Sequence, residues 1–333
     1  MAPHARVPSV TEPELPPCPS SGLTRQQWGL IFLADQIRQE PPDRLQFSHT
    51  VLCQVGLPRK HMAERRYERA NGNRSLLVEA GSLWNGLQWA EQPLPYGAIP
   101  RLVLVHISTE AVRTRSSVID VGGSMREFLL RLGLQPTGGA RGGYTALHKQ
   151  MQALAACRMT LGMTDGARVT TIDAKPIKRF DAWTFNGHSH VDPHMNQDGS
   201  QRTLWPGELE LSEDFFDTLI NHAVPLDYRA LGALKHSALA LDIYTWLAHR
   251  LPRVSNPLGT KVSWSNLKDQ FGQEYGRSKD FKKQFRHALR QVCAVYMDAR
   301  LRDFPGGLVL LPSPSPVPRT LVQIPATLAP TGD

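Results

Sequence analysis

The sequence predicts an α+β protein, mainly helical, in which one unit of helices and a hairpin occurs twice. Each unit contains a short amphipathic helix, a glycine-containing turn, a longer amphipathic helix and two short alternating strands, in that order. The spacing is also kept, because Gly133 precedes Gly166 by 33 residues and Gly272 precedes Gly306 by 34. The copies share an order of elements rather than sequence identity, which indicates a weak internal repeat.

The first unit begins with an apolar segment at 99–113, whose periodicity does not decide between helix and strand. Ser124 and Glu127 have the spacing of a capping box and predict the start of a short helix. After the turn QPTGGARGG, apolar residues at steps of three and four predict a helix over 144–158. An Asp165-Gly166 pair between alternating strands then predicts a hairpin.

The second unit repeats this succession. Helices are predicted at 237–250 and 263–272, the shorter one capped by Ser263. A turn leads into FKKQFRHALRQV at 281–292, and two strands follow around Pro305-Gly306-Gly307. This is the order of a winged helix-turn-helix, in which the last helix is anchored by its apolar stripe and can lay its outer face in a DNA major groove. The fold prediction is therefore two winged-helix domains in tandem.

The chain is predicted to have an N-terminal extension, two winged-helix domains and a tail, at 1–50, 51–206, 207–313 and 314–333. The extension is expected to be partly disordered, with a short helix at 25–38 capped by Thr24. The first domain includes a polar His-rich loop at 186–200. The second is expected to be the main DNA-binding unit, and the Pro-rich tail is expected to be disordered.

The predicted helix at 281–292 combines an apolar stripe with an outer face that has no acidic residue. Twelve Lys and Arg but five Asp and Glu lie between Arg250 and Asp303, so this segment carries +7 of a formal net charge of +8. A protein face that contacts the phosphates of a nucleic acid is expected to be rich in Lys and Arg and free of acidic residues. Solvated surface is the other common use of a lysine-rich helix face.

The predicted DNA contacts of the second unit are Arg277, Lys279, Lys282, Lys283, Arg286, His287 and Arg290. We expect Lys283, Arg286 and Arg290 to matter most, and Arg277 and Lys279 to hold phosphate at the N-terminal end of the helix. The first unit offers fewer candidates, which are Arg141 in its turn and His148, Lys149, Gln150 and Gln152 on its helix.

Two motifs suggest other chemistry. GGARGGYT, at 138–145, has the glycines of a phosphate-binding loop but Tyr144 in place of its lysine. HSHVDPH could bring His188, His190, Asp192 and His194 to one ion, but Pro193 stands where metallo-hydrolase loops have His, and the surroundings indicate a polar loop. We expect no cofactor and no native metal.

Enzymatic signatures are lacking in the sequence. Gly-x-Ser-x-Gly does not occur, and the acids of LELSEDFFD lie where a helix is predicted to start, which explains them by capping. No apolar run approaches the length of a membrane span. The cysteines Cys18, Cys53, Cys157 and Cys293 have no ligand or disulfide spacing and fit a reducing cytoplasm. These features predict a cytoplasmic protein that is not an enzyme.

Four runs of the sequence resemble the plasmid-encoded RepA replication-protein family of bacteria. They are LPYGAIPRLVLVHISTEAVRTRS, IDVGGSMREFLLRLGLQPTGGARGG, LSEDFFDTLINHAVPLDYRALGALKHSALALDIYTWLAHRL and SWSNLKDQFGQEYGRSKDFKKQFRHALRQV. The resemblance covers roughly Leu94 to Pro312. It implies a plasmid replication initiator that binds repeated double-stranded DNA sites at an origin and helps to recruit the host initiator and helicase. The architecture is also similar to that of iteron-binding initiators, which use two winged-helix domains on DNA.

Several alternatives stay open from the sequence. A repressor of its own operon would need the same cationic face, and a winged-helix scaffold for protein binding would leave that face solvated. A homodimer is compatible with the sequence, through 99–113 or the helix around Trp28 and Ile31, although core packing is the expected use of both segments. The His-rich loop and the Pro-rich ends depart from the family pattern, so their roles are open.

Overall fold

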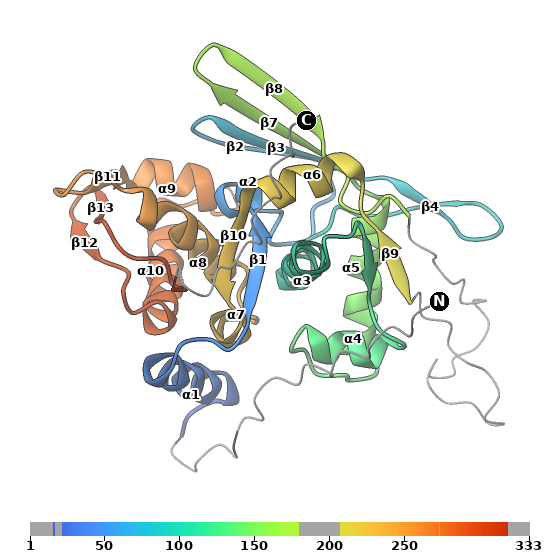
Figure 1. Ribbon diagram of the computed structural model, residues 1–333, viewed down its shortest axis with the longest axis horizontal. Coiled ribbons are helices and arrows are strands. Elements are labelled where there is room, and N and C mark those ends of the chain that lie inside the picture. The colour runs from blue at the N-terminus through green and yellow to red at the C-terminus, as the bar shows by residue number, and fades with distance from the viewer. Residues whose placement is uncertain (1–15, 17–21, 180–206, 273, 319–333) are drawn as a thin grey trace, which may run out of the picture.

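The computed structural model describes residues 16, 22–179, 207–272 and 274–318. Most of the N-terminal segment expected to be disordered, the His-rich loop at 186–200 and most of the Pro-rich tail lie outside the described residues. Within them, helices alternate with small antiparallel sheets, which confirms the α+β prediction (Figure 1). None of the described helices is long and apolar enough to cross a bilayer.

The second unit has the predicted succession. It contains α8 (Ala238–Arg250), β11 (Thr260–Ser263), α9 (Trp264–Phe271), α10 (Ser278–Val295), β12 (Leu301–Phe304) and β13 (Gly307–Leu310). The strands form one antiparallel sheet in the order β11-β13-β12. The Ser263 hydroxyl accepts a hydrogen bond from Asn266 N at 3.1 Å and so caps α9 as expected. A Cβ on Gly272 would lie 2.7 Å from Phe281, so the turn between α9 and α10 needs glycine.

The first unit keeps the order of elements but not the sheet. It contains α3 (Ala98–Thr114), β6 (Val118–Asp120), α4 (Met125–Arg131), α5 (Gly143–Ala156), β7 (Arg158–Asp165) and β8 (Arg168–Asp173). The β7–β8 hairpin turns at Gly166, whose φ of 62° suits glycine. It is extended by an upstream hairpin, β2 (Arg66–Asn71) and β3 (Arg74–Glu79), into the order β2-β3-β7-β8. Strand β6 instead pairs with β9 (Glu208–Glu210).

The undecided segment at 99–113 is the long helix α3. Its residues from Pro100 to Thr109 are all buried, so every side of this part of the helix lies inside the protein. A helix buried on all sides has no alternation of apolar and polar faces, which is why the sequence shows no helical period here. The predicted cap at Ser124 is present, with Glu127 N donating to its hydroxyl at 3.1 Å. The Glu127 carboxylate accepts from Gly123 N rather than from Ser124 N, so the capping box is only half formed.

The N-terminal elements are built into the fold around the second unit. Helix α1 (Arg25–Gln39) starts at the predicted cap Thr24, which forms a full capping box with Gln27, and it packs on α10 and on α7 (Tyr228–Leu234). Strand β1 (Leu45–His49) pairs with β10 (Ala223–Asp227), and α2 (Thr50–Gln54) packs on α8. The remaining helix α6 (Glu213–His222) starts within LELSEDFFD as predicted, and Ser212 is its N-cap.

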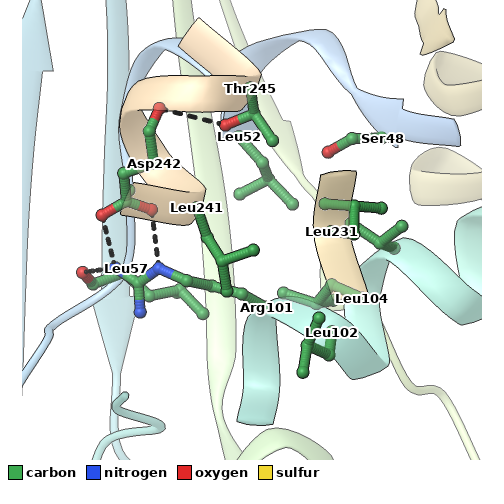
Figure 2. A pocket seen from close by; sticks show the side chains of 12 residues that line it. Ser48, Leu52, Leu57, Arg101, Leu102, Leu104, Leu231, Leu241, Asp242 and Thr245 are labelled. Atoms are coloured by element: carbon green, nitrogen blue, oxygen red, sulfur yellow. Dashed lines mark hydrogen bonds and ion pairs between the residues drawn. The ribbon is translucent and has the colours of Figure 1, made fainter. Parts of the chain in front are cut away.

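A buried ion pair joins the first helices of the two units. Arg101 of α3 donates from Nε to Asp242 Oδ1 at 2.6 Å and from Nη2 to Asp242 Oδ2 at 2.8 Å, beside a cavity of about 30 Å³ (Figure 2). Its other N–H groups donate to the carbonyls of Leu57, Pro58 and Gly97. All five donors of the guanidinium are therefore used, which makes the burial of this charge tolerable.

The chain after β13 is held against the second unit at Ser313 and Pro314. The Tyr296 hydroxyl donates to Pro314 O at 2.6 Å, and Arg300 N donates to the Ser313 hydroxyl at 2.9 Å. Val317 is buried. The first residues of the predicted Pro-rich tail therefore contribute to the core, although they form neither helix nor strand.

Candidate nucleic-acid interface

Helix α10 is anchored by an aromatic cluster. Its apolar stripe, Phe281, Phe285, Ala288, Val292 and Val295, is buried. The Phe285 ring lies between those of Phe281 and Phe271, with centroids 5.5 Å and 5.6 Å away. Burying two phenylalanines stabilises the fold by roughly 2–3 kcal/mol each. The stripe therefore fixes which side of α10 faces solvent.

The opposite side of α10 is an exposed basic face, which we define as Lys279, Lys282, Lys283, Arg286, His287 and Arg290. All are exposed except the half-buried Lys282. Among the described residues, the side chains of Lys279, Lys283 and Arg290 have no hydrogen bond or ion pair. Cations that are not neutralised within the fold are suited to phosphate oxygens.

An indole orients two cations of this face. Trp264, the first residue of α9, lies under both the Arg286 guanidinium and the Lys282 ammonium, whose Cζ and Nζ atoms are 4.9 Å and 5.5 Å from the ring centroid. Trp264 is itself buried against Phe285. Such cation–π contacts are worth roughly 0.5–1 kcal/mol each at exposed sites. Contact with the indole limits the rotamers of Arg286.

The N-terminal end of α10 differs from the expected phosphate cradle. Arg277 is its N-cap, without a side-chain cap, and its Nε donates to Asp280 Oδ2 at 2.8 Å. Asp280, in the first turn, also places a carboxylate at the positive end of the helix dipole. A phosphate bound here would compete with Asp280 for Arg277, whereas Lys279 has no such competitor.

The hairpin of the second unit carries further exposed cations. Lys261 and Arg302 both lie opposite Val309, on the strands that flank β13, so their side chains share one face of the sheet. Lys261 Nζ lies 5.8 Å from the centroid of the Phe304 ring. Arg300 and Arg302 are both exposed. Our sequence prediction did not include these residues, although the alternation of arginine in DARLRDF indicates Arg300 and Arg302.

The first unit places few of its predicted contacts on an open face. Arg141 and Lys149 are exposed, but His148 and Gln152 are half-buried. Burial lowers the pKa of His148, so its ring carries less positive charge than an exposed histidine. Gln150 is buried, and its Oε1 accepts from Tyr96 N at 2.8 Å, so it cannot reach an outside partner.

The loop that resembles a phosphate-binding loop is closed by its own contacts. Gly143 N donates to the Thr137 hydroxyl and the Thr145 hydroxyl donates to Gly139 O, both at 2.9 Å. No group of three or more potential metal ligands occurs among the described residues, and the His188, His190, Asp192 and His194 set lies outside them.

Comparison with protein families decides the identity of the chain. Residues 94–266, just over half of the sequence, match the model of the plasmid-encoded RepA protein. The chain belongs to the plasmid-encoded RepA family. The match starts where the resemblance in the sequence starts, at Leu94, but ends at Asn266 within α9. Helix α10 and its hairpin therefore lie beyond the part of this RepA-family chain that the family model covers.

Other comparisons add little. No curated protein matches the chain. A solved structure of selenomethionine derivatives of domains 2 and 3 of RctB is similar at 12% sequence identity and a TM-score of 0.44, over 79% of this chain and 96% of that one.

Proposed function

We propose that this RepA-family protein is a plasmid replication initiator that binds repeated double-stranded DNA sites at an origin and helps to recruit the host initiator and helicase. The observation that carries the DNA-binding part is the basic face of α10, which is held outward by a buried aromatic cluster. The role is one of binding rather than catalysis.

The basic face supplies two kinds of DNA contact in this proposal. Arg286, stacked on Trp264, has the planar fork that pairs with O6 and N7 of guanine in the major groove. Lys279, Lys283 and Arg290 contact phosphates, and Lys261 and Arg302 on the hairpin add phosphate contacts beside the groove. Base contacts then determine the sequence that is bound, and phosphate contacts determine register and most of the affinity.

The first test is selection of bound fragments from digested plasmid DNA by the full chain, followed by mobility shifts. Recovery of one region with repeated sites is expected, and Arg286→Ala with Arg290→Ala should abolish specific binding while the fold is kept. Arg38→Ala, an exposed arginine on α1, is the matched control. Unchanged binding by the double variant would refute the assignment of the face.

A second test separates initiation from repression of the protein's own operon. Supplied in trans, the protein should support replication of a plasmid that carries only the selected fragment, and the double variant should not. Binding without replication would favour a repressor. Failure of the wild-type chain to shift any DNA would favour a scaffold.

A further inference from the structure

A small hairpin carries a cluster of exposed apolar side chains. Strands β4 (Ser82–Trp84) and β5 (Trp89–Glu91) pair with Trp84 opposite Trp89. Trp84, Leu87 and Trp89 are 53%, 89% and 69% exposed. In Figure 1 the hairpin projects from the opposite side of the molecule to α9 and α10. We call these three side chains the apolar tip.

The turn that presents the apolar tip is held by its own hydrogen bonds. The Asn85 Oδ1 accepts from Leu87 N at 2.9 Å and from Gln88 N at 2.8 Å, and Asn85 N donates to Gln88 O at 3.1 Å. Gly86 has a φ of 94°, which only glycine adopts without strain. The two indoles contact edge to face, with centroids 5.7 Å apart. Because the tip is ordered before binding, little conformational entropy is lost when a partner covers it.

The base of the hairpin is fixed to the end of α5. Gly81 lies so close to the helix that a Cβ would be 2.0 Å from Ala156 O. Arg65 donates from Nη2 to the carbonyls of Ala80 and Gly81 and from Nη1 to Glu91 Oε2 at 3.1 Å. Leu83 packs on the core. The apolar tip is therefore a rigid projection.

The near absence of charged residues in the hairpin argues against a nucleic acid as the partner of the tip. Between Ala80 and Gln92 the only charged residue is Glu91, which Arg65 already pairs. Single-strand binders combine stacking aromatics with a groove of cations, because the backbone of the bound strand is a polyanion. Exposed tryptophans with an uncharged rim are instead typical of the centre of protein–protein interfaces.

Area and shape argue against a second copy of this chain. The tip exposes roughly 400 Å² of apolar surface, so tip-to-tip contact would bury about 800 Å² in total, less than specific complexes usually bury. Two cavities of the described chain, beside Arg101 and beside His106, have volumes of about 30 and 40 Å³ and are too small to accept an indole. A convex tip of this kind needs a concave site on a different protein.

We propose that the β4–β5 tip docks into an apolar pocket of a partner protein other than this chain. The pocket has an uncharged rim that accepts hydrogen bonds from the indole N–H groups of Trp84 and Trp89. This interaction goes beyond DNA binding and is separable from it, because the β4–β5 hairpin and helix α10 lie on opposite sides of the molecule (Figure 1).

The test uses a photo-crosslinking residue in the full chain, in cells that maintain the plasmid. p-Benzoylphenylalanine replaces Leu87 or, as a matched control, Val169, an isolated exposed residue on β8. Position 87 should cross-link to one protein that position 169 does not reach. That protein, purified, should bind the wild-type chain and bind Leu87→Ser at least about tenfold more weakly. Leu87 is mostly exposed, so Leu87→Ser should keep both the fold and the DNA shift.

Four results would overturn the proposal. They are cross-links no stronger at 87 than at 169, cross-links only within the chain or between two copies, cross-links to DNA, and equal affinity of Leu87→Ser for the captured protein. A further contrary result would be that the wild-type chain sediments with vesicles of phosphatidylcholine and phosphatidylglycerol whereas Leu87→Ser does not. The tip would then contact lipid instead. If the wild-type chain shifted no DNA, the proposed function would be contradicted. The cross-linking result at position 87 would still decide whether the tip binds a partner protein.

Discussion

The two units share an order of elements but present different surfaces. In the second unit, α10 exposes cations that have no partner among the described residues, and its hairpin adds Lys261 and Arg302. In the first unit, the equivalent helix α5 turns Gln150 inward, and its hairpin is built into a four-stranded sheet. The two units therefore share a topology without sharing a surface suited to DNA.

Contacts between the units indicate what the first one does. Arg69 of β2 is buried and donates from Nη1 to the carbonyls of Asp269 and Gln270, at the C-terminal end of α9. Arg59 pairs with Glu274 in the turn between α9 and α10, which holds the pKa of that carboxyl below its usual range against the opposing effect of burial. The first unit supports the turn that places α10.

The largest effect is expected from breaking the anchor of the basic face. Phe285→Ala removes a fully buried ring from the α9–α10 cluster and should lower the free energy of unfolding by about 3–5 kcal/mol. Urea unfolding followed by circular dichroism measures this. Loss of less than about 1 kcal/mol would show that the cluster does not hold α10.

Acid should destabilise the first unit through a buried histidine. Burial lowers the pKa of His106 on α3 to about 4. Between pH 6.5 and 4, this imidazole is therefore protonated in the unfolded chain but mostly neutral in the folded chain. His106 should therefore contribute a fall in stability of about 2–3 kcal/mol over that window, in addition to the falls from His49 and His249, whose pKa burial also lowers to about 4. His106→Leu should make this part of the pH profile in urea titrations shallower by that contribution, while the contributions of His49 and His249 remain. A profile that stays equally steep would contradict the assignment.

A smaller effect tests the support given by the first unit. Arg69→Met leaves the carbonyls of Asp269 and Gln270 without their donor and should cost about 2 kcal/mol of stability. DNA affinity should also fall severalfold, because α10 loses its fixed position. Arg66→Met, an exposed arginine on the same strand, is the control. A DNA affinity equal to that of the control would show that Arg69 has no part in placing α10.

The smallest effects compare single cations of the two units. Arg290→Ala should weaken specific DNA binding about tenfold with unchanged stability, whereas Lys149→Ala on α5 should change it less than about twofold. Mobility shifts at one fixed salt concentration measure both. Equal losses of DNA affinity in the two variants would show that both units contact DNA to the same extent.

Local signals explain what the sequence predicted well. The caps at Thr24, Ser212 and Ser263 and the hairpin at Asp165-Gly166 act over a few residues, so the sequence shows them directly. The Gly72-Asn73 turn of the β2–β3 hairpin is an equally local signal that our prediction omitted.

Tertiary contacts explain what the sequence could not show. Gln150 lies on the apolar stripe between Leu147 and Leu154, and only the fold reveals that Tyr96 N satisfies it there. The stacking of Arg286 on Trp264 and the contacts of Arg69 with α9 join residues from different elements, which periodicity does not report.

The salt dependence of binding to the selected plasmid fragment tests directly whether the basic face of α10 contacts DNA. For the wild-type chain, the logarithm of affinity should fall steeply with the logarithm of salt concentration. Lys283→Ala with Arg290→Ala, which removes two of the proposed phosphate contacts, should reduce that slope by about two, and Arg141→Ala with Lys149→Ala should leave it nearly unchanged. Equal slopes for wild type and the α10 double variant would contradict the account.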